Sequence, residues 1–123
     1  MPYSKVVYDH FFNPRNVGRM ENPDVIGKAG EPGNGPFMLL FLKVSGNAIV
    51  QATYQTYGCG PAIAAGSLLT ERISGTTCTE ARRWTEEAIH EALGGLPPEK
   101  RHCSALAATA LDKALSAWPG GTT

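Results

Sequence analysis

The stretch that decides the fold is residues 37–58, FMLLFLKVSGNAIVQATYQTYG. It contains two apolar runs on either side of Ser45, Gly46 and Asn47, which are residues typical of a tight turn. In the second run small or apolar side chains alternate with polar ones, which is the period of a half-buried strand. The face that carries Val50, Ala52 and Tyr54 is expected to be the apolar one. The stretch therefore predicts an antiparallel hairpin.

Downstream of the hairpin the pattern favours helices. Pro61 and Gly75 mark the start and the stop of a helix whose small residues suit close packing on a sheet. Two shorter helices follow, one opened by a Thr77 or Thr79 cap with Glu80 and one over residues 85–93. Residues 96–103, LPPEKRHC, are expected to be an extended connector because proline excludes helix for the residue before it. The remaining residues up to 118 repeat leucine and alanine at helical spacing.

Upstream of the hairpin the sequence predicts a helix over residues 4–12 and a long loop with one short strand over residues 25–29. The order of elements indicates an α+β fold, a small antiparallel sheet of about three strands with helices packed on one side. We expect one domain over residues 1–118 and a disordered tail over residues 119–123.

Composition narrows the functional classes. Eleven Lys and Arg balance eleven Asp and Glu, so the overall charge favours neither nucleic acid nor an acidic membrane surface. No apolar run approaches the roughly 20 residues that a membrane-spanning helix needs. Three widely spaced cysteines and no secretion-like N-terminal pattern are typical of a cytoplasmic protein.

Two cysteines carry the chemistry that stands out. Cys59 lies between two glycines at the junction of strand and helix, and Cys103 lies at the start of the last predicted helix, after His102. A helix N-terminus favours the thiolate, the form that binds metals. If the two segments meet in space, Cys59, His102 and Cys103 form a donor set suited to zinc, iron or an iron–sulfur cluster. A purely structural role for a small, buried cysteine is the alternative.

Other reactive residue types have plainer interpretations. Cys78 lies among polar residues and is expected to be exposed or half-buried, without a role at the site. His10 is expected to line the apolar face of the first helix, and His90 to lie at the surface. Tyr57 is expected to contribute to packing. An enzyme with Cys59 as nucleophile and His102 as base lacks a recognisable third group to orient the base, so no catalytic residue is assigned.

Three blocks of sequence resemble the NifU/IscU family of iron–sulfur cluster assembly scaffolds. The opening block YSKVVYDHFFNPRNVG is similar to the start of that family, and TYGCGPAIAAGSLLTE is similar to its Tyr-Gly-Cys-Gly-Ser-Ala-Ile-Ala block. The third block, LPPEKRHCSALAATAL, resembles its Leu-Pro-Pro-x-Lys and His-Cys-Ser segment. The resemblance is collinear over almost the whole chain.

The resemblance implies a cluster site at one exposed end of a helical layer on a small sheet. Family members hold a [2Fe–2S] cluster, or its iron or zinc precursor, through three cysteines, a histidine and an aspartate. Matched residue by residue, the second and third cysteines correspond to Cys59 and Cys103, and the histidine to His102. The resemblance further implies a cysteine desulfurase that delivers sulfur, and an Hsp70-type chaperone that would recognise Leu96, Pro97, Pro98 and Lys100.

This chain departs from the family pattern at the first ligand block. Asn34 stands where the first cysteine is expected, and Pro36 where the aspartate is expected. Asparagine is a neutral oxygen donor, so it is at most a weak ligand for a soft metal centre. Glu99 also replaces the valine of the chaperone segment. No nucleic-acid or membrane partner is expected.

Three functional hypotheses follow from this sequence. The first is an assembly scaffold or carrier that binds iron, zinc or a [2Fe–2S] cluster through an incomplete ligand set. The second is an interaction module that docks a desulfurase or another assembly factor without assembling clusters, with a simple zinc-binding domain as a further alternative. The third is the enzyme with Cys59 as nucleophile and His102 as base. A cluster bridged between two protomers, and hence a homodimer, is compatible with the first hypothesis.

Overall fold

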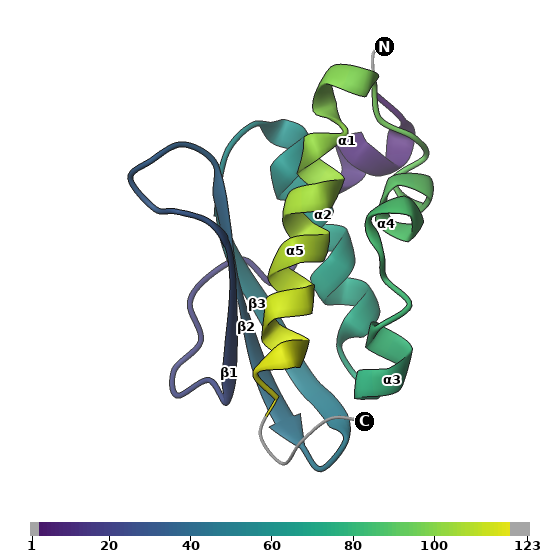
Figure 1. Ribbon diagram of the computed structural model, residues 1–123. Coiled ribbons are helices and arrows are strands. Elements are labelled where there is room, and N and C mark those ends of the chain that lie inside the picture. The colour runs from purple at the N-terminus through teal and green to yellow at the C-terminus, as the bar shows by residue number, and fades with distance from the viewer. Residues whose placement is uncertain (1–2, 119–123) are drawn as a thin grey trace.

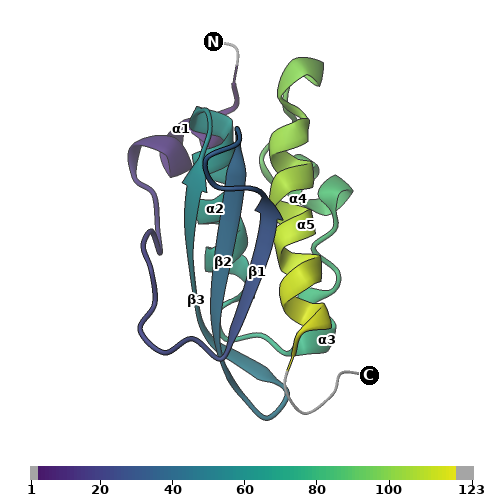
Figure 2. The ribbon, with the colours of Figure 1, turned by 60° about the vertical axis from the view of Figure 1, so that its left-hand side comes forward.

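The computed structural model describes residues 3–118 and contains one three-stranded antiparallel sheet with the helices gathered on one of its faces (Figure 1, Figure 2). The strands are β1 (Val25–Gly30), β2 (Phe37–Ser45) and β3 (Ala48–Tyr57), adjacent in that order. The predicted fold class is confirmed. The predicted tail, residues 119–123, lies outside the described residues.

The predicted hairpin is formed by β2 and β3 around Gly46, whose φ of 60° suits glycine in a tight turn. The register pairs Lys43 with Gln51 but Val44 with Ile49, so Val50 is an extra residue in β3. This bulge turns Val50 outward, where it is 58% exposed, and lets Ile49 point into the core. The predicted apolar face is therefore correct for Ala52 and Tyr54 and wrong for Val50.

The helices follow the predicted order with small shifts of their ends. The connector predicted to be extended contains instead a short 3₁₀ helix, because a proline at the first helical position already has the required φ. The last helix consequently begins earlier than the predicted pattern, at His102. The helical elements are α1 (Lys5–Phe12), α2 (Gly60–Ile73), α3 (Cys78–Ala81), α4 (Glu86–Ala92), η1 (Pro98–Lys100) and α5 (His102–Ser116).

The core lies between the sheet and helices α2 and α5. Met38, Leu40 and Leu42 alternate along β2 and are completely buried, as the two-residue period of a strand requires. Gly27 of β1 brings the sheet close to α5, since a Cβ atom there would lie 2.0 Å from the backbone oxygen of Ala110. A glycine at this position therefore sets the distance between β1 and α5.

A second close contact joins β3 to α2. The ring of Tyr54 lies against Gly66, where a Cβ atom would be 2.4 Å from the ring. The Tyr54 hydroxyl donates a hydrogen bond of 3.0 Å to the carbonyl of Ile63, and burial raises the pKa of Tyr54 to about 12. Because Ile63 lies in the first turn of α2, this contact fixes the helix start that follows Cys59.

The fold places the chemistry-bearing residues at two opposite ends of the sheet. The turn from β3 to α2, the loop of residues 31–36 and the start of α5 gather at one end (Figure 1, Figure 2). Cys78 belongs to the other end, because its backbone N–H donates to the carbonyl of Asn47 in the hairpin turn. Cys78 is only 6% exposed, so the expectation of an exposed or half-buried side chain was wrong. Within residues 3–118, no helix has the length and apolar character needed to cross a membrane.

Candidate metal centre

The three residues expected to bind metal come together at the end of the molecule. One donor atom from each of Cys59, His102 and Cys103 lies within 4.8 Å of the other two. The Sγ atoms of Cys59 and Cys103 are 3.4 Å apart, and His102 Nε2 is 3.6 Å from Cys103 Sγ. Cys59 is partly exposed, His102 is exposed and Cys103 is fully buried. The centre therefore has one buried side and one side open to solvent.

The backbone around Cys59 leaves its thiol free. Cys59 is the N-cap residue of α2, with an extended conformation (φ −85°, ψ 176°), and its side chain makes no capping hydrogen bond. Its carbonyl accepts from the backbone N–H groups of Ala62 and Ile63, so the backbone is held while Sγ takes no part in capping the helix. This is the arrangement expected of a ligand rather than of a helix cap.

His102 and Cys103 open α5, and a contact that the sequence did not reveal anchors them. The side chain of Arg101 donates to Glu86 at 3.4 Å and also to Glu87, both in the first turn of α4. The start of α5 has no side-chain cap of its own. Because Arg101 directly precedes His102, these contacts tie the start of α5 to α4. No local sequence signal could indicate this ion pair, since its partners are 14 and 15 positions apart.

The protonation expected for Cys103 was wrong for the metal-free chain. Burial, and then the hydrogen bond with the Cys59 thiol, raise the pKa of Cys103 to about 12. Desolvation of the buried sulfur disfavours the thiolate more strongly than the N-terminus of α5 favours it. The metal-free centre therefore holds Cys103 as a thiol, and a bound metal would have to displace its proton.

Two of the three donor separations are close to those of a tetrahedral metal ion. Ligand bonds of about 2.3 Å for sulfur and 2.0–2.1 Å for nitrogen imply sulfur–sulfur and sulfur–nitrogen separations of roughly 3.8 and 3.6 Å in a tetrahedral site. The distances of 3.4 Å between the thiols and 3.6 Å between Cys103 Sγ and His102 Nε2 are close to these values. Two thiols and an imidazole are also the donor types that zinc, iron and iron–sulfur units prefer.

The comparison of the sequence with family models decides the kinship of the chain. Residues 2–123 match the model of the NifU-like N terminal domain. The chain belongs to this NifU-like family.

Curated relatives share about half of their residues with this family member. It is 50% identical over 113 residues to iron-sulfur cluster assembly scaffold protein IscU 1 of Archaeoglobus fulgidus, covering 92% of this chain and 74% of the relative. It is 48% identical over 120 residues to the IscU scaffold protein of Buchnera aphidicola subsp. Schizaphis graminum, covering 94% and 93%. The corresponding protein of Azotobacter vinelandii is 46% identical over 119 residues, covering 94% and 92%.

Solved structures agree on the fold of the NifU-like chain. A protein from Fervidobacterium islandicum AW-1, named as a candidate iron-sulfur cluster assembly scaffold for the SUF system, superposes with a TM-score of 0.76. The two chains are 23% identical, and the match covers 94% of this chain and 97% of the other. At that identity the likeness establishes the three-stranded sheet and its helical layer, and nothing about the site.

The loop that departs from the family pattern lies at the same end as the donors. Phe37 pairs with Tyr57 across the sheet, which brings residues 31–36 next to the turn that carries Cys59. Asn34 is exposed and stands between Gly33 and Gly35, whose φ values of 87° and 96° are left-handed. The position of the loop agrees with the predicted ligand block, and a ligand role for Asn34 stays a prediction.

An apolar pocket beside Cys59 was not predicted. It has a volume of about 200 Å³ and is lined by Cys59, Gly60 and Pro61 from α2, together with Tyr3, Val7, Tyr8 and Phe11 from the N-terminal segment. Phe12 and Tyr57 at the same end are 70% and 65% exposed. The packing expected of Tyr57 is limited to one face of its ring, which stacks on Phe37 with ring centroids 6.3 Å apart. The sequence held one indication of this pocket, because α1 carries more apolar residues than a single buried helix face can hold, so some of them must line an exposed surface.

His10 is buried as expected, but in a polar network rather than against apolar residues alone. Its Nδ1 atom is 2.7 Å from Ser67 Oγ, and its Nε2 atom is 3.6 Å from Glu71. Arg15 contacts the same imidazole, and burial followed by the Arg15 charge lowers the pKa of His10. The network joins α1 to α2 and so holds one wall of the apolar pocket.

His90 is half-buried, and its Nδ1 accepts from Leu96 N–H at 3.4 Å, so the expected surface position was only partly correct.

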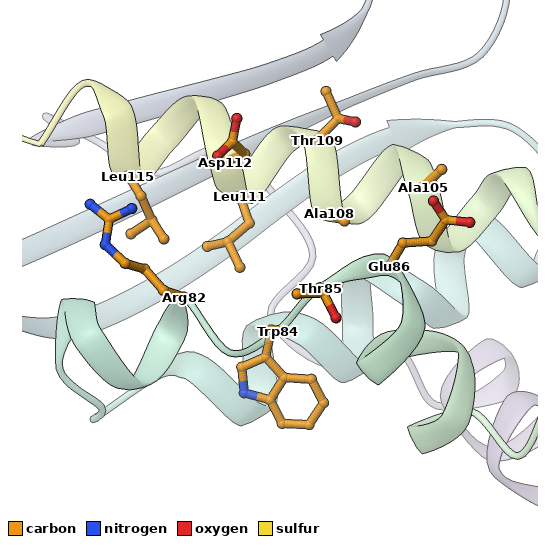
Figure 3. A pocket seen from close by; sticks show the side chains of 10 residues that line it. All are labelled: Arg82, Trp84, Thr85, Glu86, Ala105, Ala108, Thr109, Leu111, Asp112 and Leu115. Atoms are coloured by element: carbon orange, nitrogen blue, oxygen red, sulfur yellow. The ribbon is translucent and has the colours of Figure 1, made fainter.

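A larger hollow lies away from the metal donors (Figure 3). Its volume is about 380 Å³, and it lies between the α3–α4 connection, with Arg82 and Trp84, and one side of α5, with Ala108 and Leu111. None of its lining residues is a cysteine or a histidine. The hollow offers no soft metal donor, so the candidate centre remains at the start of α2 and α5.

Proposed function

We propose that this chain is an iron–sulfur cluster assembly scaffold or carrier, with iron, zinc or a [2Fe–2S] cluster as its cargo. One observation carries the proposal: two thiols and an imidazole converge within 4.8 Å at one end of a NifU-like fold. The curated relatives are named as cluster assembly scaffolds. The scaffold unit would be the single domain of residues 1–118, and its role would be binding and transfer rather than enzymatic catalysis.

Cys59 and Cys103 would hold the cargo as thiolates and His102 as a neutral imidazole. Cargo iron would supply the Lewis acidity that draws the two protons from the thiols. The buried Cys103 would restrict solvent on the inner side, while the exposed His102 would leave the outer side open for loading and release. A site with three protein donors keeps a coordination position open for the incoming or outgoing group.

The loss of the first cysteine would weaken cluster retention. Asn34 brings an amide oxygen in place of a thiolate, and Pro36 brings no side-chain donor at all. A cluster on this chain would therefore be held less tightly than on a protein with a complete set, which suits a carrier that must release its cargo. A second protomer that contributes its own thiols would compensate, so a homodimer is part of the proposal.

A cysteine desulfurase is the proposed sulfur donor. The apolar pocket lined by Cys59, with the exposed Phe11 and Phe12 beside it, supports a protein partner at this end because large exposed apolar patches mark interaction sites. The support for an Hsp70-type chaperone is weaker. Leu96 is only 7% exposed, so the segment of Leu96, Pro97, Pro98 and Lys100 would have to open before a chaperone could grip it. A cytoplasmic location is proposed with these partners.

Anaerobic reconstitution with ferrous iron and sulfide tests the function. We expect the wild-type chain to take up iron, with the charge-transfer absorption of a [2Fe–2S] cluster or of thiolate-bound iron. The Cys59→Ser and Cys103→Ser variants should lose this absorption. Cys78→Ser is the matched control, since it removes a thiol at the opposite end of the sheet. Iron uptake that is equal in all four chains, or absent from the wild type, would contradict the proposal.

The altered Asn34 and Pro36 also favour a second candidate, an interaction module that docks assembly factors without binding cargo. That function requires no metal uptake but retains association with the desulfurase. A binding measurement with the desulfurase of the same organism separates the two. Association without reconstitution supports the module, and reconstitution with sulfur transfer supports the scaffold.

A further inference from the structure

The two thiols of the candidate centre are already in contact. Cys59 Sγ and Cys103 Sγ are 3.4 Å apart, although their residues are 44 positions apart in the chain. A disulfide has a sulfur–sulfur bond of about 2.05 Å, so bonding requires the two atoms to approach by roughly 1.4 Å. We propose that Cys59 and Cys103 form a reversible disulfide that switches the centre between a reduced form that binds metal and an oxidised form that does not.

The local backbone allows Cys59 to make this movement. Gly58 and Gly60 flank it, and its side chain holds no capping hydrogen bond that would have to break. Cys103 is completely buried in the first turn of α5, so it stays in place while Cys59 turns toward it. The bond would join the β3–α2 turn covalently to the start of α5, two segments that are otherwise connected only through the chain between Cys59 and Cys103.

The pairing is unambiguous because this chain has lost a cysteine. Where a third thiol would be expected the sequence has Asn34, and Cys78 is buried at the opposite end of the sheet. With three thiols at one centre, three disulfides would compete. Here the described cysteines leave only Cys59 with Cys103.

The oxidant is a low-molecular-weight disulfide such as oxidised glutathione. The partly exposed Cys59, as thiolate, attacks one sulfur of the oxidant, which forms a mixed disulfide and expels one glutathione thiolate. Cys103 attacks the Cys59 sulfur, which expels the second glutathione thiolate, and the proton of Cys103 passes to that departing thiolate. The first glutathione thiolate takes up a proton from solvent, which replaces the one that Cys59 released on forming its thiolate. Two protein thiols are thereby oxidised and one glutathione disulfide is reduced to two thiols, with two electrons transferred.

Oxidation removes two of the three donors at once. Cysteine binds zinc or iron as the thiolate, and a disulfide has no thiolate, so His102 would remain as the single donor among the three. A bound metal would in turn protect both sulfurs from the oxidant. The thiol chemistry stands by itself, and only its effect on metal uptake rests on the proposed function, so the two are measured in separate arms.

The first arm maps the disulfide. The metal-free full chain is incubated with oxidised glutathione and unfolded in denaturant, the remaining thiols are alkylated, and the products are analysed by intact mass and peptide mapping. We expect a loss of two hydrogens, alkylation of Cys78 alone and a crosslinked pair of peptides that contain Cys59 and Cys103. Dithiothreitol added before the alkylation step should return all three thiols. A lasting glutathione adduct on Cys59 of the wild type, or a disulfide that includes Cys78, would overturn the proposal.

Two variants sharpen this arm. Cys103→Ser removes the resolving thiol, so Cys59 should retain glutathione as a stable adduct. Cys78→Ser should crosslink as the wild type does. The wild-type map decides the question even if either variant folds poorly.

The second arm measures zinc binding by the reduced and oxidised chains. We expect the affinity of the oxidised chain to be lower by about tenfold or more and to recover on reduction. Equal affinity of the two forms would overturn the switch. A reduced chain that binds no zinc would contradict the metal-binding role in the proposed function and in the switch, while a mapped disulfide would still stand.

Discussion

At the scale of single residues, the two cysteines of the centre have unlike surroundings. Cys59 caps a helix between two glycines and is partly exposed, whereas Cys103 is fully buried and its pKa is raised by that burial. Because Cys103 is buried and protonated in the metal-free chain, metal binding must release its proton, and metal uptake should therefore depend on pH. The exposed thiol and the exposed His102 would therefore meet a metal first, and Cys103 would complete its binding.

Asn34 is the residue whose replacement should change function most. The Asn34→Cys variant would add a third thiolate on the loop next to the Cys59 turn, so we expect more [2Fe–2S] cluster per chain and slower cluster loss to a chelator. The gain should be at least several-fold, since groups that only orient the metal ligands already change metal affinity by about 10–100-fold. Cluster absorbance after anaerobic reconstitution measures it. Asn34→Ser is the matched control, and an equal gain in both variants would argue against a ligand role at this position.

At the scale of the elements, close packing of helix on sheet sets where the donors lie. Gly27 lets α5 approach β1, and Gly66 lets α2 approach the ring of Tyr54. Each of these helices carries part of the centre at its N-terminus. The separation of the sulfurs therefore depends on Gly27 in β1 and Gly66 in α2, neither of which belongs to the centre.

Gly27→Ala tests this dependence. The added methyl would clash with the backbone of Ala110, which cannot move aside as a side chain could, so we expect a loss of about 1–3 kcal/mol in the free energy of unfolding. Urea unfolding followed by circular dichroism gives the value. The neighbouring exposed Lys28→Ala serves as control and should change stability by less than about 0.5 kcal/mol. A neutral Gly27→Ala would mean that α5 is not held against β1 as described.

At the scale of the whole molecule, the centre joins segments that are distant in the chain. Cys59 follows β3, while His102 and Cys103 open α5, and the ion pair of Arg101 with Glu86 adds α4 to the same assembly. A ligand held by all of these elements binds the folded chain and not the unfolded one. Metal binding should therefore stabilise the entire fold.

Zinc should raise the melting temperature of the reduced chain. At a free zinc concentration of 100 times Kd, the expected gain is about 2.7 kcal/mol, or about 10 °C for a domain of this size. Thermal unfolding with zinc and with a chelator measures the shift. Cys59→Ser should abolish it and Cys78→Ser should keep it. A shift that survives the loss of Cys59 would place the stabilising zinc elsewhere.

Local patterns in the sequence were sufficient to predict the hairpin, the helix of residues 4–12 and a capped helix start at Thr77 or Thr79, which the structure places at Thr77, because each depends on neighbours a few residues apart. The donor types and the loss of a cysteine at Asn34 could likewise be read from the sequence. The outward turn of Val50 could not, because a bulge depends on how two strands pair.

What the sequence alone determined is the order of elements, the three candidate donors and their kinship with the scaffold family. Only the tertiary structure decided that the donors meet, that Cys103 is buried and protonated, that Cys78 is buried at the far end, and that two thiols touch. The reason is physical. Distances between residues 44 positions apart, and the exclusion of water that sets a thiol pKa, are fixed by packing of helices on the sheet and not by any local pattern.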